Sequence, residues 1–232
     1  MVHISDTHVC DAQSPARLPF TNRYGDPHYL EKPFVEGPVG NYRPQELLTS
    51  QVLRQMISTI NQIKGPVSGS GVELAVITGD LTDNAQENEF SWVRNLLIGG
   101  TVSPNSGSRN EYEGPGGNLF DPYYWNPDEQ NESDFPKDLF GFPTIPELTM
   151  AAINSFSSPG LQMPFLAVHG NHDELLQGTV APEPWLNELA TLEKRPTNLI
   201  QDSLFHEVVS KFSPVGPTCW PTPEMMNQVS TT

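Results

Sequence analysis

The sequence predicts an α/β domain whose central sheet contains parallel strands joined by helical crossovers. Three short apolar runs, each ending abruptly at polar residues, have the length and composition of buried strands. Segments with helical periodicity separate these runs, which is the order of β-α-β units. Chemistry in such sheets gathers beyond the carboxyl ends of the strands, so the residues directly after each run are the first candidates for a site.

The three predicted strands are short and rich in β-branched and other apolar residues. They are MVHIS (1–5), ELAVIT (73–78) and PFLAV (164–168). Runs of this kind are typical of strands in parallel sheets, which are buried on their faces by helices. We therefore expect the three strands to be neighbours, with helices packed on the outer face of the sheet.

Residues 44–65 predict an amphipathic helix between the first two strands. Pro44 is favoured in a first helical turn, and Gly65-Pro66 is a stop signal. The apolar residues recur at helical spacing and predict the buried face: Leu47, Leu48, Val52, Met56, Ile60 and Ile63.

Two more helices are predicted after the second strand. Asn84 is a candidate N-cap for a helix running to about Leu97, with Glu87 three positions on as its capping-box partner. Gly99-Gly100 then ends this helix. A third helix is predicted over 147–156.

Residues 99–143 interrupt this pattern and predict an insertion. The segment is rich in Gly, Pro, Asn and Ser, yet its aromatic residues include Tyr112, Phe120, Tyr123, Tyr124 and Trp125. Because linkers rarely hold so many aromatics, we expect a packed insertion near the site. The whole chain, 1–232, is predicted to form one domain. Its C-terminal part has a weak helical pattern at 202–212 and an irregular tail at 213–232.

The charge balance excludes several classes of partner. The chain carries 28 acidic and 12 basic residues, a formal charge of −16, which disfavours binding to nucleic acid or to anionic lipid. We therefore expect small, cationic or metallic partners. No run reaches the roughly 18 apolar residues of a membrane span, and the N-terminus lacks a signal-peptide pattern, so the sequence as written predicts a soluble chain. Two cysteines are too few for a disulfide scaffold, although a single bond stays open.

The residues directly after the three strands carry metal-binding groups. They are Asp6-Thr7-His8, then Gly79-Asp80-Leu81-Thr82-Asp83, then Gly170-Asn171-His172-Asp173. Parallel strands that end side by side bring such groups to one rim, where Asp6 and His8 point the same way if the backbone stays extended. Carboxylate, imidazole and amide oxygen ligands suit Mn, Fe, Zn or Mg, and one carboxylate can bridge two ions. The sequence predicts a metal site here.

These three motifs, in this order and each after an apolar strand, resemble the calcineurin-like metallophosphoesterase superfamily. The resemblance implies a four-layer αββα sandwich, here incomplete, around two divalent ions. It implies that Asp6 and His8 bind the first ion, Asp80 bridges both, and Asn171 binds the second. The opening DTHVCDAQSPAR is also similar to one bacterial subgroup, many of whose members carry export signals.

The resemblance further implies a reaction. A metal-bridging hydroxide would attack the phosphorus of a phosphomonoester or phosphodiester in line, while His172 stabilises or protonates the departing alkoxide. Asp173 would orient His172 by a hydrogen bond. A small phosphoester is the expected substrate.

The sequence departs from the family after His172. The family supplies three further histidines downstream, two of them in a Gly-His-x-His motif, but only His206 follows here. We therefore expect the chain to represent the N-terminal metal-binding half of the domain, with weak metal binding and an unpaired strand edge that favours aggregation or dimerisation. A catalytically inactive metal-binding or scaffold protein is the alternative. A nuclease is disfavoured by the acidic balance.

Several polar residues near the motifs have more ordinary interpretations. Asp83 is interpreted as a turn or helix N-terminal residue rather than as a support for the ligands, and Cys10 as a packed thiol rather than a ligand. His3 is interpreted as a core or edge histidine, and His169 as structural or pocket-lining. Three cations are candidates for holding phosphate: Arg17, Arg109 and Lys137.

Overall fold

The computed structural model divides the chain into two compact units. It describes residues 1–20, 22, 42–117, 120–178, 184–194, 196–199 and 229–231. The first unit comprises Met1–Gln13 and Pro44–Gly178, and the second comprises Ser14–Arg43 and Thr179–Thr232. All three predicted strands and all six predicted site residues lie in the first unit. The predicted helix at 202–212, with His206, lies outside the described residues.

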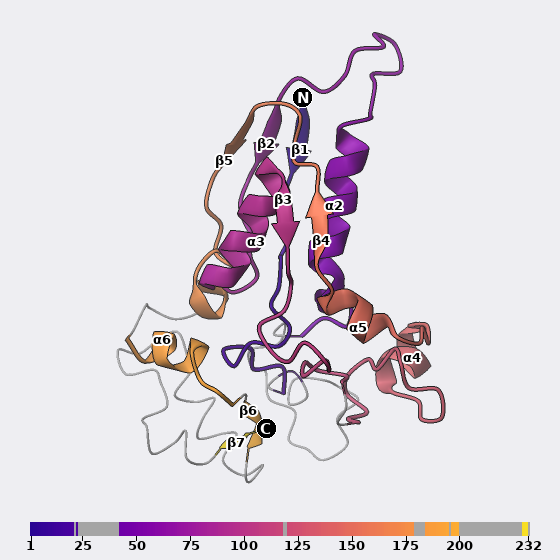
Figure 1. Cartoon of the computed structure of the whole chain (residues 1–232), viewed down its shortest axis with the longest axis vertical. Helices are drawn as coiled ribbons and strands as arrows, with labels where there is room; N and C mark the ends of the chain where they lie inside the picture. The colour runs from indigo at the N-terminus through magenta and orange to yellow at the C-terminus, as the bar shows by residue number, and fades with distance from the viewer. Residues whose placement is uncertain are drawn as a thin grey trace. The chain divides into compact units, whose positions relative to one another are not determined.

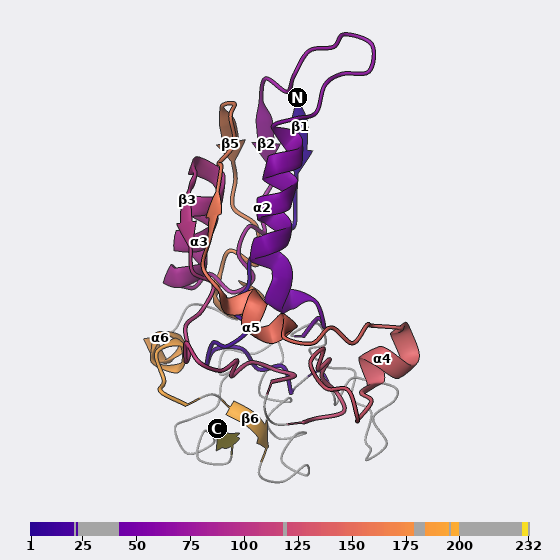
Figure 2. The ribbon, with the colours of Figure 1, turned by 45° about the vertical axis from the view of Figure 1, so that its right-hand side comes forward.

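The three predicted strands form a parallel sheet, as expected. They are β1 (Val2–Ile4), β2 (Ala75–Ile77) and β5 (Phe165–Ala167), in the order β1-β2-β5 (Figures 1 and 2). In the register, Ile4 lies opposite Ile77, and Ile77 lies opposite Ala167. Since all three strands run the same way, their carboxyl ends meet at one edge of the sheet.

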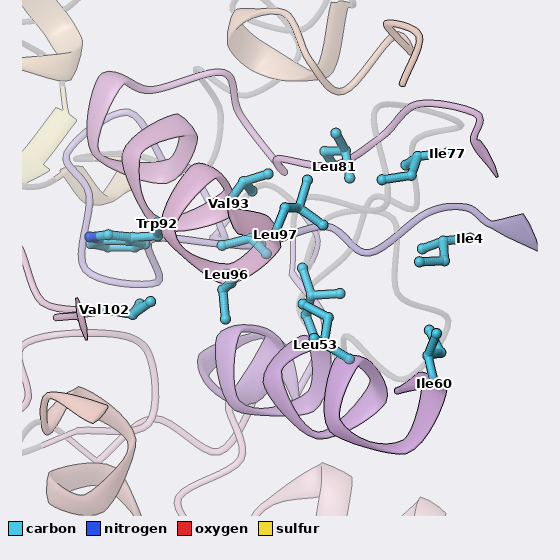
Figure 3. Packing of buried hydrophobic residues seen from close by; sticks show 12 residues of the cluster. Ile4, Leu53, Ile60, Ile77, Leu81, Trp92, Val93, Leu96, Leu97 and Val102 are labelled. Carbon is cyan, nitrogen blue, oxygen red and sulfur yellow. The ribbon is translucent and has the colours of Figure 1, made fainter. Parts of the chain in front are cut away.

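Two helices pack on one face of this sheet. They are α2 (Thr49–Ile60), which follows a 3-10 turn η1 (Glu46–Leu48), and α3 (Glu87–Ile98). Ile4 and Ile77 of the sheet pack with Leu53 of α2 and Leu96 of α3 in one apolar core (Figure 3). The protein is therefore an α/β protein with a small parallel sheet.

The buried face of α2 differs from the predicted one. Three residues predicted to face the core are 53%, 38% and 47% exposed: Val52, Met56 and Ile63. Leu53, Ile57 and Ile60 are buried instead. Apolar residues stand on two neighbouring stripes of this helix, and its contacts with the sheet and α3 select one of them. The helix is also shorter than the predicted 44–65: it follows a 3-10 turn at its start and ends at Ile60.

The start of α3 also differs from the prediction. Gln86, rather than Asn84, is the N-cap, and its capping-box partner is Glu89 rather than Glu87. Ala85 has a φ of 50°, in the left-handed region, so a right-handed helix can begin only after it. Gly99, with a φ of 89°, ends the helix near the predicted position.

A pair of antiparallel strands that the sequence did not predict packs on α3. They are β3 (Gly100–Val102) and β4 (Phe156–Ser158). Val102 is buried in the main core, and Phe156 packs against it. Each strand has only three residues, and neither shows a periodicity that could have been recognised. The pair brackets 103–155, so the predicted insertion at 99–143 begins with a strand.

Aromatic residues of the insertion lie in a second apolar core, which also contains Cys10, Ala12 and Leu47 from outside the insertion. Tyr112, Tyr124 and Trp125 are buried, and the Trp125 indole N–H donates to the Pro143 carbonyl at 2.9 Å. Tyr112 and Trp125 are therefore packed core residues, as interpreted from the sequence, but the core that they join extends beyond the insertion. The short helices here are α4 (Phe135–Phe140) and α5 (Leu148–Ile153), the second inside the predicted 147–156.

The remaining elements are few. A 3-10 turn η2 (Leu175–Gly178) closes the first unit. The second unit contains α6 (Pro184–Ala190) and the antiparallel strands β6 (Pro196–Leu199) and β7 (Val229–Thr231). Strand β7 falls in the predicted irregular tail, whose residues 213–228 lie outside the described part. No described helix has both the length and the apolar composition needed to cross a membrane.

The face of the sheet opposite α2 and α3 carries exposed apolar side chains. Leu166 and Val168 are 66% and 60% exposed. Strand β5 pairs with β2, and no described strand pairs with its other edge. This is the unpaired edge expected from the sequence, and the aggregation or dimerisation that it favours stays a prediction.

The choice of buried stripe on α2 predicts a difference between two neighbouring substitutions. Ile57→Ala should lower the free energy of unfolding by about 2–5 kcal/mol, because Ile57 is fully buried and its truncation leaves a cavity. Val52→Ala, on the exposed stripe, should change it by no more than about 0.5 kcal/mol. Urea denaturation followed by circular dichroism measures both. Equal losses would contradict burial of the Ile57 stripe alone, and a larger loss in Val52→Ala would show that the helix buries the other stripe.

Candidate metal centre

The loops after β1 and β2 remain paired beyond the ends of the strands. The backbone N–H of Asp6 donates to the Gly79 carbonyl at 3.3 Å, and that of His8 donates to the Asp80 carbonyl at 3.0 Å. A parallel bridge between Val9 and Thr82 continues the pairing. The two loops that carry Asp6, His8 and Asp80 are therefore held side by side by their own backbones.

The three predicted ligands of these loops have left-handed backbones. The φ angles are 56° at Asp6, 43° at His8 and 52° at Asp80. Residues other than glycine rarely adopt this region, because it costs of the order of 1–3 kcal/mol for each residue. Residues in this conformation cluster at functional sites. The expected extended backbone from Asp6 to His8 is therefore not what the structure shows. Left-handed turns at both residues orient their side chains instead.

Side chains from the three loops converge on one point. Ligand atoms of His8, Asp80 and His172 all lie within 4.8 Å of one another, and the three residues are half-buried. The rings of His8 and His172 meet edge to face, with centroids 4.3 Å apart. An oxygen of Asp6 lies 3.7 Å from Nε2 of His8. Four of the six predicted site residues thus share one cluster.

The other two predicted site residues have different surroundings. Asn171 is exposed, and its side-chain amide N–H donates to the Gln177 carbonyl at 3.2 Å, so its oxygen is the atom that could bind a metal. Asp173 is buried and accepts hydrogen bonds from Thr82 and from the Gly170 backbone. It joins two loops rather than orienting the His172 ring, which corrects the role expected for it.

Asp83, rather than Asp173, lies beside the His172 ring. One oxygen of its fully buried carboxylate lies 3.3 Å from Nδ1 of His8 and 3.3 Å from Nδ1 of His172. The contact with His8 has an ion-pair distance but lacks hydrogen-bond alignment. A carboxylate at Nδ1 leaves Nε2 of each ring as the atom for a ligand or substrate. Asp83 was interpreted as a turn residue, and its spacing of three from Asp80 was the only signal in the sequence.

Two glycines allow the loops to approach each other. A Cβ on Gly79, whose φ is 101°, would lie 2.7 Å from the backbone of Gly170. A Cβ on Gly170 would lie 2.5 Å from the backbone nitrogen of Asp80 and would also strike its carboxylate. The His172 N–H also donates to Asp80 Oδ1 at 2.9 Å. The close approach at Gly170 and this hydrogen bond together hold the second loop against the third.

The electrostatics of the cluster favour ionised Asp6. The Ser5 hydroxyl donates a hydrogen bond to its carboxylate, and the His8 imidazole lies beside it. The Ser5 bond first, then His8 and a hydrogen bond with Asp80, lower the pKa of Asp6 below its ordinary value. Its negative charge is therefore present throughout the neutral range, where a divalent cation would need it.

Apart from Asp83, the residues with ordinary interpretations do not belong to the cluster. Cys10 is buried beside Leu47 in the second apolar core, which supports a packed thiol. His3 is exposed and shares a hydrogen bond of 2.8 Å with Thr78, as an edge histidine would. His169 forms an exposed pair with Glu174 at 3.2 Å.

The cluster has the chemistry of a site for a divalent metal. Imidazole nitrogen and carboxylate oxygen are ligands that Mn, Fe, Zn and Mg accept in differing proportions. Comparisons of this chain with protein-family models, with curated proteins and with solved structures find no match. What this site can do therefore follows from its own residues.

The close contact at Gly170 predicts a loss of metal binding on substitution. Gly170→Ala should weaken Mn binding roughly 10-fold or more, because the added methyl displaces Asp80 from the cluster. Gly71→Ala is the matched control, since a Cβ there meets nothing within 4 Å. Isothermal titration calorimetry measures both affinities. Equal affinities in the two variants would contradict the contact.

Proposed function

We propose that this chain is a metal-dependent phosphoesterase of the calcineurin-like type, which hydrolyses a small phosphomonoester or phosphodiester. The observation that carries the proposal is the convergence of His8, Asp80 and His172 from three parallel strand ends. The order of the three motifs along the chain supports the same reaction class.

The residues proposed to hold metal are the four that the motifs indicate. Asp6 and His8 would bind one ion, Asn171 a second, and Asp80 would bridge them. The donor set supports this because each residue offers an oxygen or nitrogen, and Asp83 directs Nε2 of His8 away from the core. Two divalent ions bound there would polarise a phosphoryl oxygen and supply a nucleophile at neutral pH.

His172 is proposed to act on the leaving group. Its backbone N–H is fixed by Asp80, and its Nδ1 lies 3.3 Å from Asp83 Oδ1 and from the Asp83 carbonyl. These contacts set the orientation of the ring and leave Nε2 to donate a proton to the departing oxygen. The ring also lies within the ligand cluster, so the proton would be delivered close to the phosphorus.

The charge of the chain supports a small substrate. With a formal charge of −16, the protein would repel a polyanion such as nucleic acid. A single phosphoester group has much less charge to desolvate and could be neutralised by bound cations. The identity of the substrate would then depend on residues outside the four motifs.

A second candidate function is metal binding without catalysis. The observation that favours it is the sequence after His172, which contains one histidine, His206, and no Gly-His-x-His motif. Turnover separates this candidate from the first.

Hydrolysis of an aryl phosphate in the presence of Mn is the direct test. The unaltered chain should release the phenolate, and Asp80→Asn should reduce kcat/KM by roughly a hundredfold or more, because the bridging charge is lost. Asp138→Asn, at an exposed position of α4, is the control and should match the unaltered chain. Metal binding with no turnover would favour the second candidate. Failure to bind metal would exclude both.

The position of Asp83 predicts a kinetic signature. Asp83→Asn should lower kcat roughly 10–100-fold, because the neutral amide orients the His8 and His172 rings less firmly. KM should stay within about twofold, because the fully buried Asp83 cannot touch the substrate. Steady-state kinetics with the aryl phosphate separate these constants. An unchanged kcat would contradict the orienting role.

A further inference from the structure

Glu89 is a buried carboxylate that contacts both of the loops from β1 and β2. It lies in the first turn of α3, is fully buried, and does not belong to the ligand cluster. Its Oε1 accepts the backbone N–H of Asp11 at 2.8 Å, and its Oε2 accepts that of Asn84 at 2.9 Å. One carboxylate thus binds the backbones of two loops that are far apart in the sequence.

These two backbone bonds lie next to the candidate site. Asp11 follows His8 by three residues, and Asn84 directly follows Asp83. His8 and Asp83 are the pair whose imidazole and carboxylate lie 3.3 Å apart. Glu89 therefore constrains the separation of the two loops just beyond the point where this contact is made.

The contacts of Glu89 exceed what a helix cap requires. A capping box needs only the bond from Glu89 to the N–H of Gln86, which is the longest of the three backbone bonds at 3.3 Å. The bond to Asp11 comes from another strand's loop and contributes nothing to the helix. Asp11 is itself buried, and its side chain accepts a bond from Asn88 of α3 at 2.6 Å, which adds a second tie between the same elements.

We propose that Glu89 is a positioning residue, which sets the distance between the His8 and Asp83 loops and thereby the geometry of the metal cluster. This inference rests on the proposed metal site. The positioning role requires a side chain with two acceptor oxygens at position 89. Glutamine has one acceptor and one donor, so one of the loop N–H groups would face another N–H. Aspartate is shorter by one methylene and could not reach both loops.

Cobalt binding tests this proposal independently of turnover. Co(II) has visible absorption that depends on the number and arrangement of its ligands, so a shifted ligand loop changes the spectrum. Glu89→Gln should weaken Co(II) binding roughly 10-fold or more and should change the absorption bands. Titration of the metal-free full chain with cobalt chloride measures both, and thermal unfolding is followed in parallel.

Two variants separate positioning from general stability. Asp134→Asn changes another fully buried carboxylate that accepts two backbone N–H groups, from Asn126 at 2.9 Å and Lys137 at 3.0 Å, but within the insertion. Gln86→Ala removes the N-cap side chain of α3, including its long 3.4 Å bond to Oε1 of Glu89, and keeps both oxygens that accept the loop N–H groups. Both should lower the melting temperature and leave cobalt affinity and spectrum unchanged.

Each outcome has one meaning. A weaker and altered cobalt complex in Glu89→Gln alone supports the positioning role. An unchanged complex in Glu89→Gln, or equal changes in Gln86→Ala and Asp134→Asn, overturns it while the proposed function stands. If Glu89→Gln does not fold, Glu89→Asp replaces it with the same expectation. Absence of cobalt binding by the unaltered chain overturns the proposed function, and this inference with it.

Discussion

The parallel pairing of β1 with β2, continued through the loops beyond both strands, is the constraint on which the candidate site depends. The bonds from the N–H groups of Asp6 and His8 to the carbonyls of Gly79 and Asp80 fix the two loops residue by residue. A shift in register would move every side chain of one loop relative to the other. The apolar core of α2, α3 and the sheet stabilises this register, and it includes Val9 and Leu81, which directly follow His8 and Asp80 in the two loops.

Close approach of the loops requires backbone conformations that few residues adopt. Gly79 and Gly170 contact each other where any Cβ would clash, and Asp6, His8 and Asp80 have positive φ. The free energy for these conformations has to come from the hydrogen bonds between the loops and from the rest of the fold. The same backbone turns bring the carboxylates and imidazoles together, so strain and ligand geometry arise from one arrangement.

Buried carboxylates hold the loops together in a chain that has few basic residues. Asp83 lies against two imidazoles, Asp173 accepts from Thr82 and Gly170, and Glu89 accepts from the backbones of Asp11 and Asn84. Backbone N–H groups and histidines thus do what arginine or lysine does elsewhere. Hydrogen bonds to a buried carboxylate are directional, so these three residues determine the geometry of the loops as well as their stability.

The sequence by itself determined the three parallel strands, the approximate helices and the residues at the strand ends, because apolar runs and polar motifs are local properties. It did not determine which stripe of α2 is buried, since Val52 and Leu53 are equally apolar and only the sheet and α3 distinguish them. Nor could it assign Asp83 and Glu89, whose partners come from other loops. Tertiary structure decided these roles because a carboxylate acquires its function from the donors that folding brings to it.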